Sequence, residues 1–264
     1  MKRYWLRFSA LGLALLLLPI GAAYGQATLP VENHYKVYTI SPGYSLVKPI
    51  TLIDQFGVVS VDYLYLDRFA NPAEKRVLDT GQVYPIVDPL AHLKWWHLDI
   101  PQPVREVIAI DQFGYGPVKL GNAVYLLTPT LKNPPPPPVP PLPYRNHYLC
   151  YEVIGSQPVY KRVALVDQFG VSTDVMVLQP KYFCNPVEKH ADGRIYPIMD
   201  YKAHLQCYQV DNPAFDLHGV VALDQFGYHQ FTTYRNDCLC LPALKEHIVG
   251  TERSTWGQIK SLYR

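Results

Sequence analysis

"ALVDQFGVS", residues 164–172, contains a tetrapeptide that occurs four times in this chain of 264 residues. The four copies of Asp-Gln-Phe-Gly, called the turn motif below, start at Asp54, Asp111, Asp167 and Asp224. Internal repeats are considered before other sequence signals, because overlooking one leads to the wrong fold. One site rarely needs four copies of a catalytic group, whereas four strand ends need four turns. The repetition therefore predicts a structural role for the turn motif.

The turn motifs belong to two homologous units. "NHYKVY" at Asn33 returns as "NHYLCY" at Asn146, 113 residues later, and "FANPAEK" returns as "FCNPVEK" with a shift of one residue. We predict a first unit over residues 28–133 and a second unit over residues 144–246. Residues 134–143, "PPPPPVPPLP", separate them. Because proline runs favour an extended rod, we predict a semi-rigid linker there.

Each unit is itself a duplication, because two further blocks recur in all four half-units. The histidine block pairs a histidine with an aromatic residue four positions later: His34 and Tyr38, His92 and Trp96, His147 and Tyr151, His204 and Tyr208. The proline block pairs a proline with a lysine three positions later: Pro72 and Lys75, Pro129 and Lys132, Pro186 and Lys189, Pro242 and Lys245. Every half-unit has the order histidine block, turn motif, proline block.

The segments between these blocks predict an all-β protein. They are short, rich in Val, Ile and Tyr, and bounded by Gly, Pro, Asn and Asp. We expect each unit to form its own β-barrel or β-sandwich of about six strands with pseudo-two-fold symmetry. The one helical candidate is the tail, residues 247–264, where Ser254 could cap an apolar stripe.

The turn motif suits the end of a strand. An aspartate there can accept hydrogen bonds from backbone N–H groups ahead of it, and a glycine supplies the positive φ that closes a tight turn. We predict this role for Asp54 with Gly57, Asp111 with Gly114, Asp167 with Gly170, and Asp224 with Gly227. The recurring histidine either bonds the turn aspartate or faces solvent.

Metal binding and catalysis by these residues are disfavoured. Calcium takes six or more oxygen ligands, and each turn motif offers one carboxylate. A catalytic His–Asp pair needs a nucleophile, and no Ser, Thr or Cys recurs at a fixed place in all four half-units. We therefore predict no metal and no cofactor.

Residues 1–25 are typical of a signal peptide. Lys2, Arg3 and Arg7 precede an apolar run over residues 10–23, and small residues follow. The run is shorter than the ~20 residues of a spanning helix. We predict a cleaved signal, a secreted or periplasmic protein and no membrane span after cleavage; an uncleaved anchor is the alternative. Cleavage removes three basic residues and no acidic ones, which changes the net charge from +2 to −1. A nearly neutral chain lacks the basic surface that nucleic-acid binding requires.

All five cysteines lie in the second unit, and export would allow them to form disulfides. Cys150, Cys184, Cys207 and Cys240 occupy repeat positions, which hold Val37, Ala70, Trp95 and Leu127 in the first unit. Internal symmetry favours Cys150 with Cys184 and Cys207 with Cys240, each closing a loop of about 35 residues. Two crossed pairings obey the same symmetry and stay open. Cys238 is left over, for an intermolecular bond in an oligomer or as a free thiol.

The second unit resembles an uncharacterised secreted bacterial repeat domain of unknown function. The likeness rests on "LCYEV", "VDQFG", "FCNPVEK", "HLQCYQV" and "LCLPALK". It covers nearly all of residues 146–245 and, without the cysteines, residues 33–132. The resemblance implies a repeat fold and brings no catalytic or binding residues with it.

Three functions fit these observations. The first is a non-catalytic structural or interaction module of the cell envelope or extracellular matrix, with a protein or glycan partner. The second is a carbohydrate-binding protein, because 21 Tyr and 4 Trp offer ring faces that stack on sugars. Aromatic residues shared by all half-units belong in the core, so the candidates are Tyr115, Tyr228 and Trp256. The third, an enzyme such as a hydrolase, lacks any recognisable catalytic motif. We predict the first, and we expect activity where the copies differ.

Overall fold

The computed structural model describes residues 29, 31–134, 145–211 and 215–247, and every regular element in this part of the chain is a β-strand. The strands are β1 (His34–Asp54), β2 (Gly57–Val77), β3 (Val83–Tyr84), β4 (His92–Ile100), β5 (Arg105–Asp111), β6 (Gly114–Lys132), β7 (His147–Ile154), β8 (Lys161–Asp167), β9 (Gly170–Ala191), β10 (Arg194–Tyr196), β11 (His204–Asp211), β12 (Phe215–Asp224) and β13 (Gly227–His247). The predicted signal peptide and almost all of the predicted linker and tail lie outside the described residues. Within them, no helix is long and apolar enough to cross a membrane.

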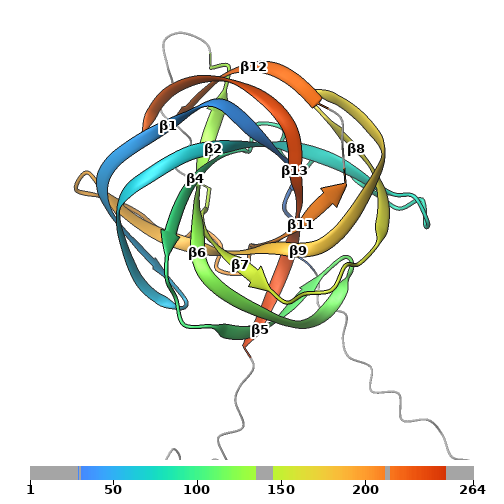
Figure 1. The fold of residues 1–264 in the computed structure, drawn as a ribbon, viewed down its shortest axis with the longest axis horizontal. Helices are drawn as coiled ribbons and strands as arrows, with labels where there is room; N and C mark the ends of the chain where they lie inside the picture. The colour runs from blue at the N-terminus through green and yellow to red at the C-terminus, as the bar shows by residue number, and fades with distance from the viewer. Residues whose placement is uncertain (1–28, 30, 135–144, 212–214, 248–264) are drawn as a thin grey trace, which may run out of the picture.

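The strands form one antiparallel sheet that closes on itself. The pairing path runs β1-β13-β11-β9-β7-β6-β4-β2 and returns to its start, because β1 pairs with β2 as well as with β13. Figure 1 shows these strands arranged around a common centre. The histidine blocks start β1, β4, β7 and β11, and each turn motif joins two strands in a hairpin. We call the closed path of strands the ring.

The two units share this sheet, in contrast to the separate closed sheets that we expected. The first unit supplies the run β6-β4-β2-β1 and the second supplies β13-β11-β9-β7, so each unit builds half of the ring. The halves join where β1 pairs with β13 and where β6 pairs with β7. A half alone would leave two unpaired strand edges, and closing the ring satisfies their backbone groups.

Each turn-motif hairpin also reaches the proline block of the other unit. The pairs are residues 51–53 with 188–190, 74–77 with 163–166, 107–110 with 244–247, and 131–132 with 222–223. Each unit thus contributes two hairpins to its partner and receives two in return. This reciprocity is a second reason why neither unit closes by itself.

Side chains from both units fill the interior of the ring. One buried apolar cluster draws members from β1, β2, β4, β6, β7, β9, β11 and β13, and it includes Tyr35, Trp95, Tyr148 and all five cysteines. The structure bonds Cys150 to Cys184 and Cys207 to Cys240, each pair directly opposite across neighbouring strands. The first unit places Val37 opposite Ala70 and Trp95 opposite Leu127 at the same positions. Packing therefore replaces the two covalent links in that half.

Cys238 is the one free cysteine of the second unit, and it is fully buried. Burial, followed by the nearby Asp237 carboxylate, raises the pKa of its thiol far above the usual range. A buried, protonated thiol is a poor nucleophile. The prediction of an oligomer linked through Cys238 does not fit this position, because the sulfur would have to leave the core to reach another chain.

Candidate functional site

The aspartate of each turn motif closes its own hairpin. In all four copies Oδ1 accepts a hydrogen bond from the backbone N–H of the phenylalanine two residues later, at 2.7–3.0 Å. The glycines, Gly57, Gly114, Gly170 and Gly227, have φ between +113° and +145°. L side chains rarely adopt that region, so glycine is required there. Asp and Gly together hold the turn that joins two strands.

The second carboxylate oxygen, Oδ2, accepts a hydrogen bond from the other unit. The donors are Tyr151 to Asp54 (2.9 Å), Tyr208 to Asp111 (2.6 Å), Tyr38 to Asp167 (2.8 Å) and the indole N–H of Trp96 to Asp224 (3.0 Å). Each donor is the aromatic residue of a histidine block. Hydrogen bonds to charged groups contribute about 1.5–3 kcal/mol each, so these bonds help to hold the units together.

The phenylalanine of each turn motif lies between a ring and a lysine. It meets the same aromatic donor edge to face, with ring centroids 5.1–5.3 Å apart. The proline-block ammonium groups lie 4.3–4.7 Å from these phenylalanines: Lys245 over Phe56, Lys75 over Phe113, Lys132 over Phe169, and Lys189 over Phe226. Burial lowers the pKa of Lys75 and Lys189 to about 7 and that of Lys245 to about 8.

Two of the four recurring histidines contact the glutamine of a turn motif, and all four are buried rather than facing solvent. His34 Nε2 lies 2.8 Å from Gln112 Oε1, and His147 Nε2 lies 2.9 Å from Gln225 Oε1. The aromatic residue four positions later occupies the place beside the aspartate. Burial lowers the pKa of His34 and His147 to about 3, so both rings are neutral at physiological pH.

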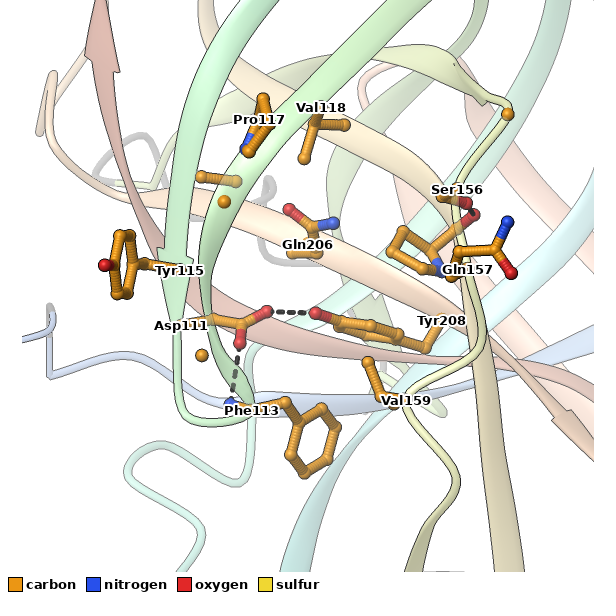
Figure 2. Close-up of a pocket in the computed structure, with 15 residues that line it drawn as sticks. Asp111, Phe113, Tyr115, Pro117, Val118, Ser156, Gln157, Val159, Gln206 and Tyr208 are labelled. Carbon is orange, nitrogen blue, oxygen red and sulfur yellow. Dashed lines mark hydrogen bonds between the residues drawn. The ribbon is translucent and has the colours of Figure 1, made fainter.

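Each turn-motif hairpin, together with the histidine block of the other unit that contacts it, forms one quadrant of the ring. One of the four quadrants contains a pocket of about 430 Å³. It lies between the β5–β6 hairpin, the segment of residues 155–159 and strand β11. Figure 2 shows Asp111 on one side, Ser156 and Gln157 on the other, and the Gln206 carboxamide between them. The volume falls in the ~300–1,000 Å³ range of small-molecule sites.

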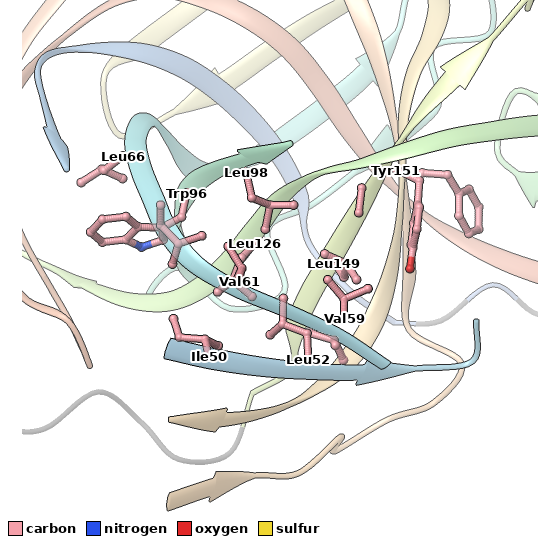
Figure 3. Packing of buried hydrophobic residues seen from close by; sticks show 14 of the residues in the cluster. Ile50, Leu52, Val59, Val61, Leu66, Trp96, Leu98, Leu126, Leu149 and Tyr151 are labelled. Carbon is pink, nitrogen blue, oxygen red and sulfur yellow. The ribbon is translucent and has the colours of Figure 1, made fainter. Parts of the chain in front are cut away.

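At this pocket, the quadrant differs from the other three at two opposed positions. These are the second residue after the histidine and the fifth residue after the turn aspartate, and they face each other across the units. Lys36 donates to Ser172 at 2.9 Å, and Lys94 Nζ lies 2.9 Å from His229 Nδ1. Leu149 and Val59 belong to one apolar cluster (Figure 3). The fourth combination is Gln206 with Gly116, and it leaves the space open.

Gln206 and Asp111 supply the chemistry of this pocket, which we call the Asp111 pocket. Gln206 is 2% exposed, and no described residue pairs with its Oε1. The other three aspartates accept a further side-chain bond from Asn185, Asn71 or Thr128, whereas Leu241 stands at that position for Asp111 and cannot donate. Burial raises the pKa of Asp111. Both groups therefore have capacity for a hydrogen-bonding ligand.

Only one of the three binding residues expected from the sequence lines the Asp111 pocket. Tyr115 lines the Asp111 pocket and is 83% exposed. Tyr228 is exposed on the β12–β13 hairpin and does not line this pocket, and Trp256 lies outside the described residues. Sequence reasoning missed Gln206 and Gly116. The signal for them was available in the two positions that change from one half-unit to the next.

A second pocket, of about 320 Å³, lies at one end of the ring. Three of its polar side chains are engaged within the protein: Arg145 pairs with Asp88, and Asn33 and Asn146 bond the backbones of residues 87–88 and 199–200. No group of three or more His, Cys, Asp or Glu in the described ranges has the arrangement of a metal site. The Asp111 pocket is therefore the stronger candidate.

Comparisons with known proteins identify a family and nothing more specific. A family model described as a repeat of unknown function (DUF7450) matches residues 92–242. The match begins at a histidine block and ends at a proline block, so it follows the half-unit boundaries seen in the sequence. Searches of curated proteins and of solved structures found no match.

Proposed function

The chain belongs to this repeat family of unknown function, and we propose that it is a non-catalytic interaction module of the cell envelope or extracellular matrix. In this proposal residues 1–25 direct export and are removed. The two units, connected through the proline-rich residues 134–143, then form one rigid body that presents its surfaces to a protein or glycan partner.

The observation that carries this proposal is the structural use of every turn motif. All four aspartates hold a turn with one oxygen and a bond from the other unit with the second. All four phenylalanines pack between a ring and a lysine. The most repeated residues thus support a scaffold, and scaffolds of this kind carry function at positions that vary.

Export is supported by the cysteines. Two disulfides lie inside the ring, and such bonds persist in oxidising compartments outside the cytosol. The apolar run in the first 25 residues has the length and the basic flank of a secretion signal.

Co-sedimentation tests this proposal. The mature protein, without residues 1–25, is mixed with insoluble envelope or matrix material, and the pellet and supernatant are analysed for protein and for released soluble fragments. We expect saturable retention in the pellet without accumulating fragments. Retention equal to that of the heat-unfolded protein would contradict an interaction role, and fragments that accumulate beyond one per protein molecule would establish an enzyme instead.

A further inference from the structure

We propose that the Asp111 pocket is a carbohydrate-binding site that takes a neutral saccharide through its hydroxyl groups. This inference rests on the proposed interaction role and names the ligand class and the residues. It goes beyond the aromatic content of the sequence, because it depends on one quadrant of the ring differing from the other three.

At Gly116 the pocket lacks a side chain that each of the other three quadrants has. Gly116 lines the pocket, as do Ala109 opposite it on β5 and Val118 on the same face of β6. A Cβ atom added to Gly116 would meet nothing within 4 Å. In the other quadrants the equivalent residues Val59, Ser172 and His229 are larger. No side chain at residue 116 therefore obstructs a ligand in this pocket.

The polar group that the missing side chain would have met is still present. In two quadrants a lysine at the Gln206 position bonds the residue at the Gly116 position, Lys36 to Ser172 and Lys94 to His229. In the Asp111 pocket no described residue pairs with Gln206 Oε1, although its side chain is almost fully buried. Buried polar groups in folded proteins are rarely left without a partner, and each exception requires an explanation. A ligand that forms a hydrogen bond with the Gln206 carboxamide would explain why no protein group does so.

Hydroxyl groups match the pocket better than charged groups do. A hydroxyl can donate to the Gln206 oxygen or accept from its nitrogen, and it can donate to the Asp111 carboxylate. The lining residues include no Lys, Arg or His to hold an anion. The single carboxylate is too few for a calcium ion.

The remaining walls suit the carbon face of a sugar ring. Ala109, Val118, Val159 and Pro180 provide apolar surface, and Tyr208 provides an aromatic ring. Polar groups stand on several sides of this surface, with Asp111 and Ser156 on opposite walls (Figure 2). Saccharides carry hydroxyls around an apolar ring face and bind to mixed surfaces of this kind.

The test is calorimetric titration of the mature protein with defined saccharides. The probes are glucose, galactose, mannose and N-acetylglucosamine, each as the monosaccharide and as a trisaccharide. We expect saturable binding of at least one probe. Gly116→Trp should weaken that binding at least ten-fold by filling the pocket. Gln206→Leu, which copies the residue at Leu149, should weaken it about three- to ten-fold by removing one hydrogen bond.

Gly219→Trp is the matched control, because Gly219 is exposed on β12 and an added Cβ there also meets nothing within 4 Å. It should bind the saccharide as the wild type does, and circular dichroism checks that every variant is folded. The proposal is overturned if no saccharide binds, or if Gly116→Trp and Gln206→Leu both bind normally. Binding of choline or lysine, lost in Gln206→Leu, would replace a saccharide with a cationic ligand.

The same variants in the co-sedimentation assay separate the two proposals. Retention on envelope or matrix material without saccharide binding would refute only the carbohydrate site. Saccharide binding without retention would refute only the envelope or matrix role.

Discussion

At the scale of single residues, a four-fold repeated sequence produces four different environments. The turn motif is identical in all four copies, yet the residue that faces the position two residues beyond it from the other unit is a lysine, a leucine or a glutamine. The residue at the Gly116 position changes with it, so that polar faces polar and apolar faces apolar in three quadrants. These opposed positions lie on different units. Which of them face each other depends on the strand order, and the repeat pattern in the sequence does not contain that order.

The bond between Tyr38 and Asp167 provides a test at this scale. Tyr38 is fully buried, and its hydroxyl donates to the Asp167 carboxylate at 2.8 Å. Tyr38→Phe should lower the free energy of unfolding by about 1.5–3 kcal/mol, because a buried carboxylate loses a donor. Urea denaturation measures the change. Tyr63→Phe is the control: Tyr63 is 54% exposed and its hydroxyl meets Ser45 on the surface, so a change under about 0.5 kcal/mol is expected. Equal effects in the two variants would show that the bond to Asp167 contributes little.

At the scale of strands and hairpins, local chemistry was sufficient for most predictions. Alternation and turn residues predicted an all-β chain, because both act over a few neighbouring residues. For His34 and His147, neither alternative, a bond to the turn aspartate or exposure to solvent, matches the structure, and the reason is physical. The aspartate lies on a hairpin contributed by the other unit, and the register of that docking places Tyr38 or Tyr151 beside the carboxylate and His34 or His147 beside a glutamine.

The buried proline-block lysines make stability depend on pH. Burial lowers the pKa of Lys189 to about 7, from a usual value of 10.5, and its ammonium lies 4.1 Å from the Tyr196 ring and 4.7 Å from the Phe226 ring. Between these pH values the unfolded chain binds more protons than the folded protein does. The free energy of unfolding should therefore rise with pH from about 7 to about 10. Below pH 7 the cost of burying the charged Lys189 ammonium group should no longer change with pH.

Lys189→Met tests this dependence. Urea denaturation at pH 6, 7, 8, 9 and 10 should show the variant gaining on the wild type by on the order of 2 kcal/mol at pH 6, with the gain shrinking as the pH rises. The exposed Lys119→Met controls for the loss of one positive charge. Parallel curves for Lys189→Met and the wild type would mean that the aromatic rings compensate fully for the burial of the ammonium group.

At the scale of the whole molecule, the sequence predicted two homologous units but did not predict that they share one sheet. Internal similarity reports which segments have the same fold, and it is the same whether each unit closes alone or both close together. Whether each unit closes its own sheet depends on which strand pairs with the unpaired strand edges of that unit. The run β6-β4-β2-β1 has two of them, and the second unit offers β7 and β13 at matching positions. The same reasoning explains why the Asp111 pocket was not predicted, because its walls come from both units.

Cutting the chain between the units tests this shared sheet. A protease site placed within residues 135–144 and cleaved in the folded protein should leave the two fragments associated. The reason is that β1–β13 and β6–β7 pairing and the four aspartate bonds all cross between the units. Size-exclusion chromatography should show one species at the volume of the uncut protein, separating only in denaturant. Two folded species of half the size would instead mean that each unit closes its own sheet. The control is the uncut protein that carries the same protease site.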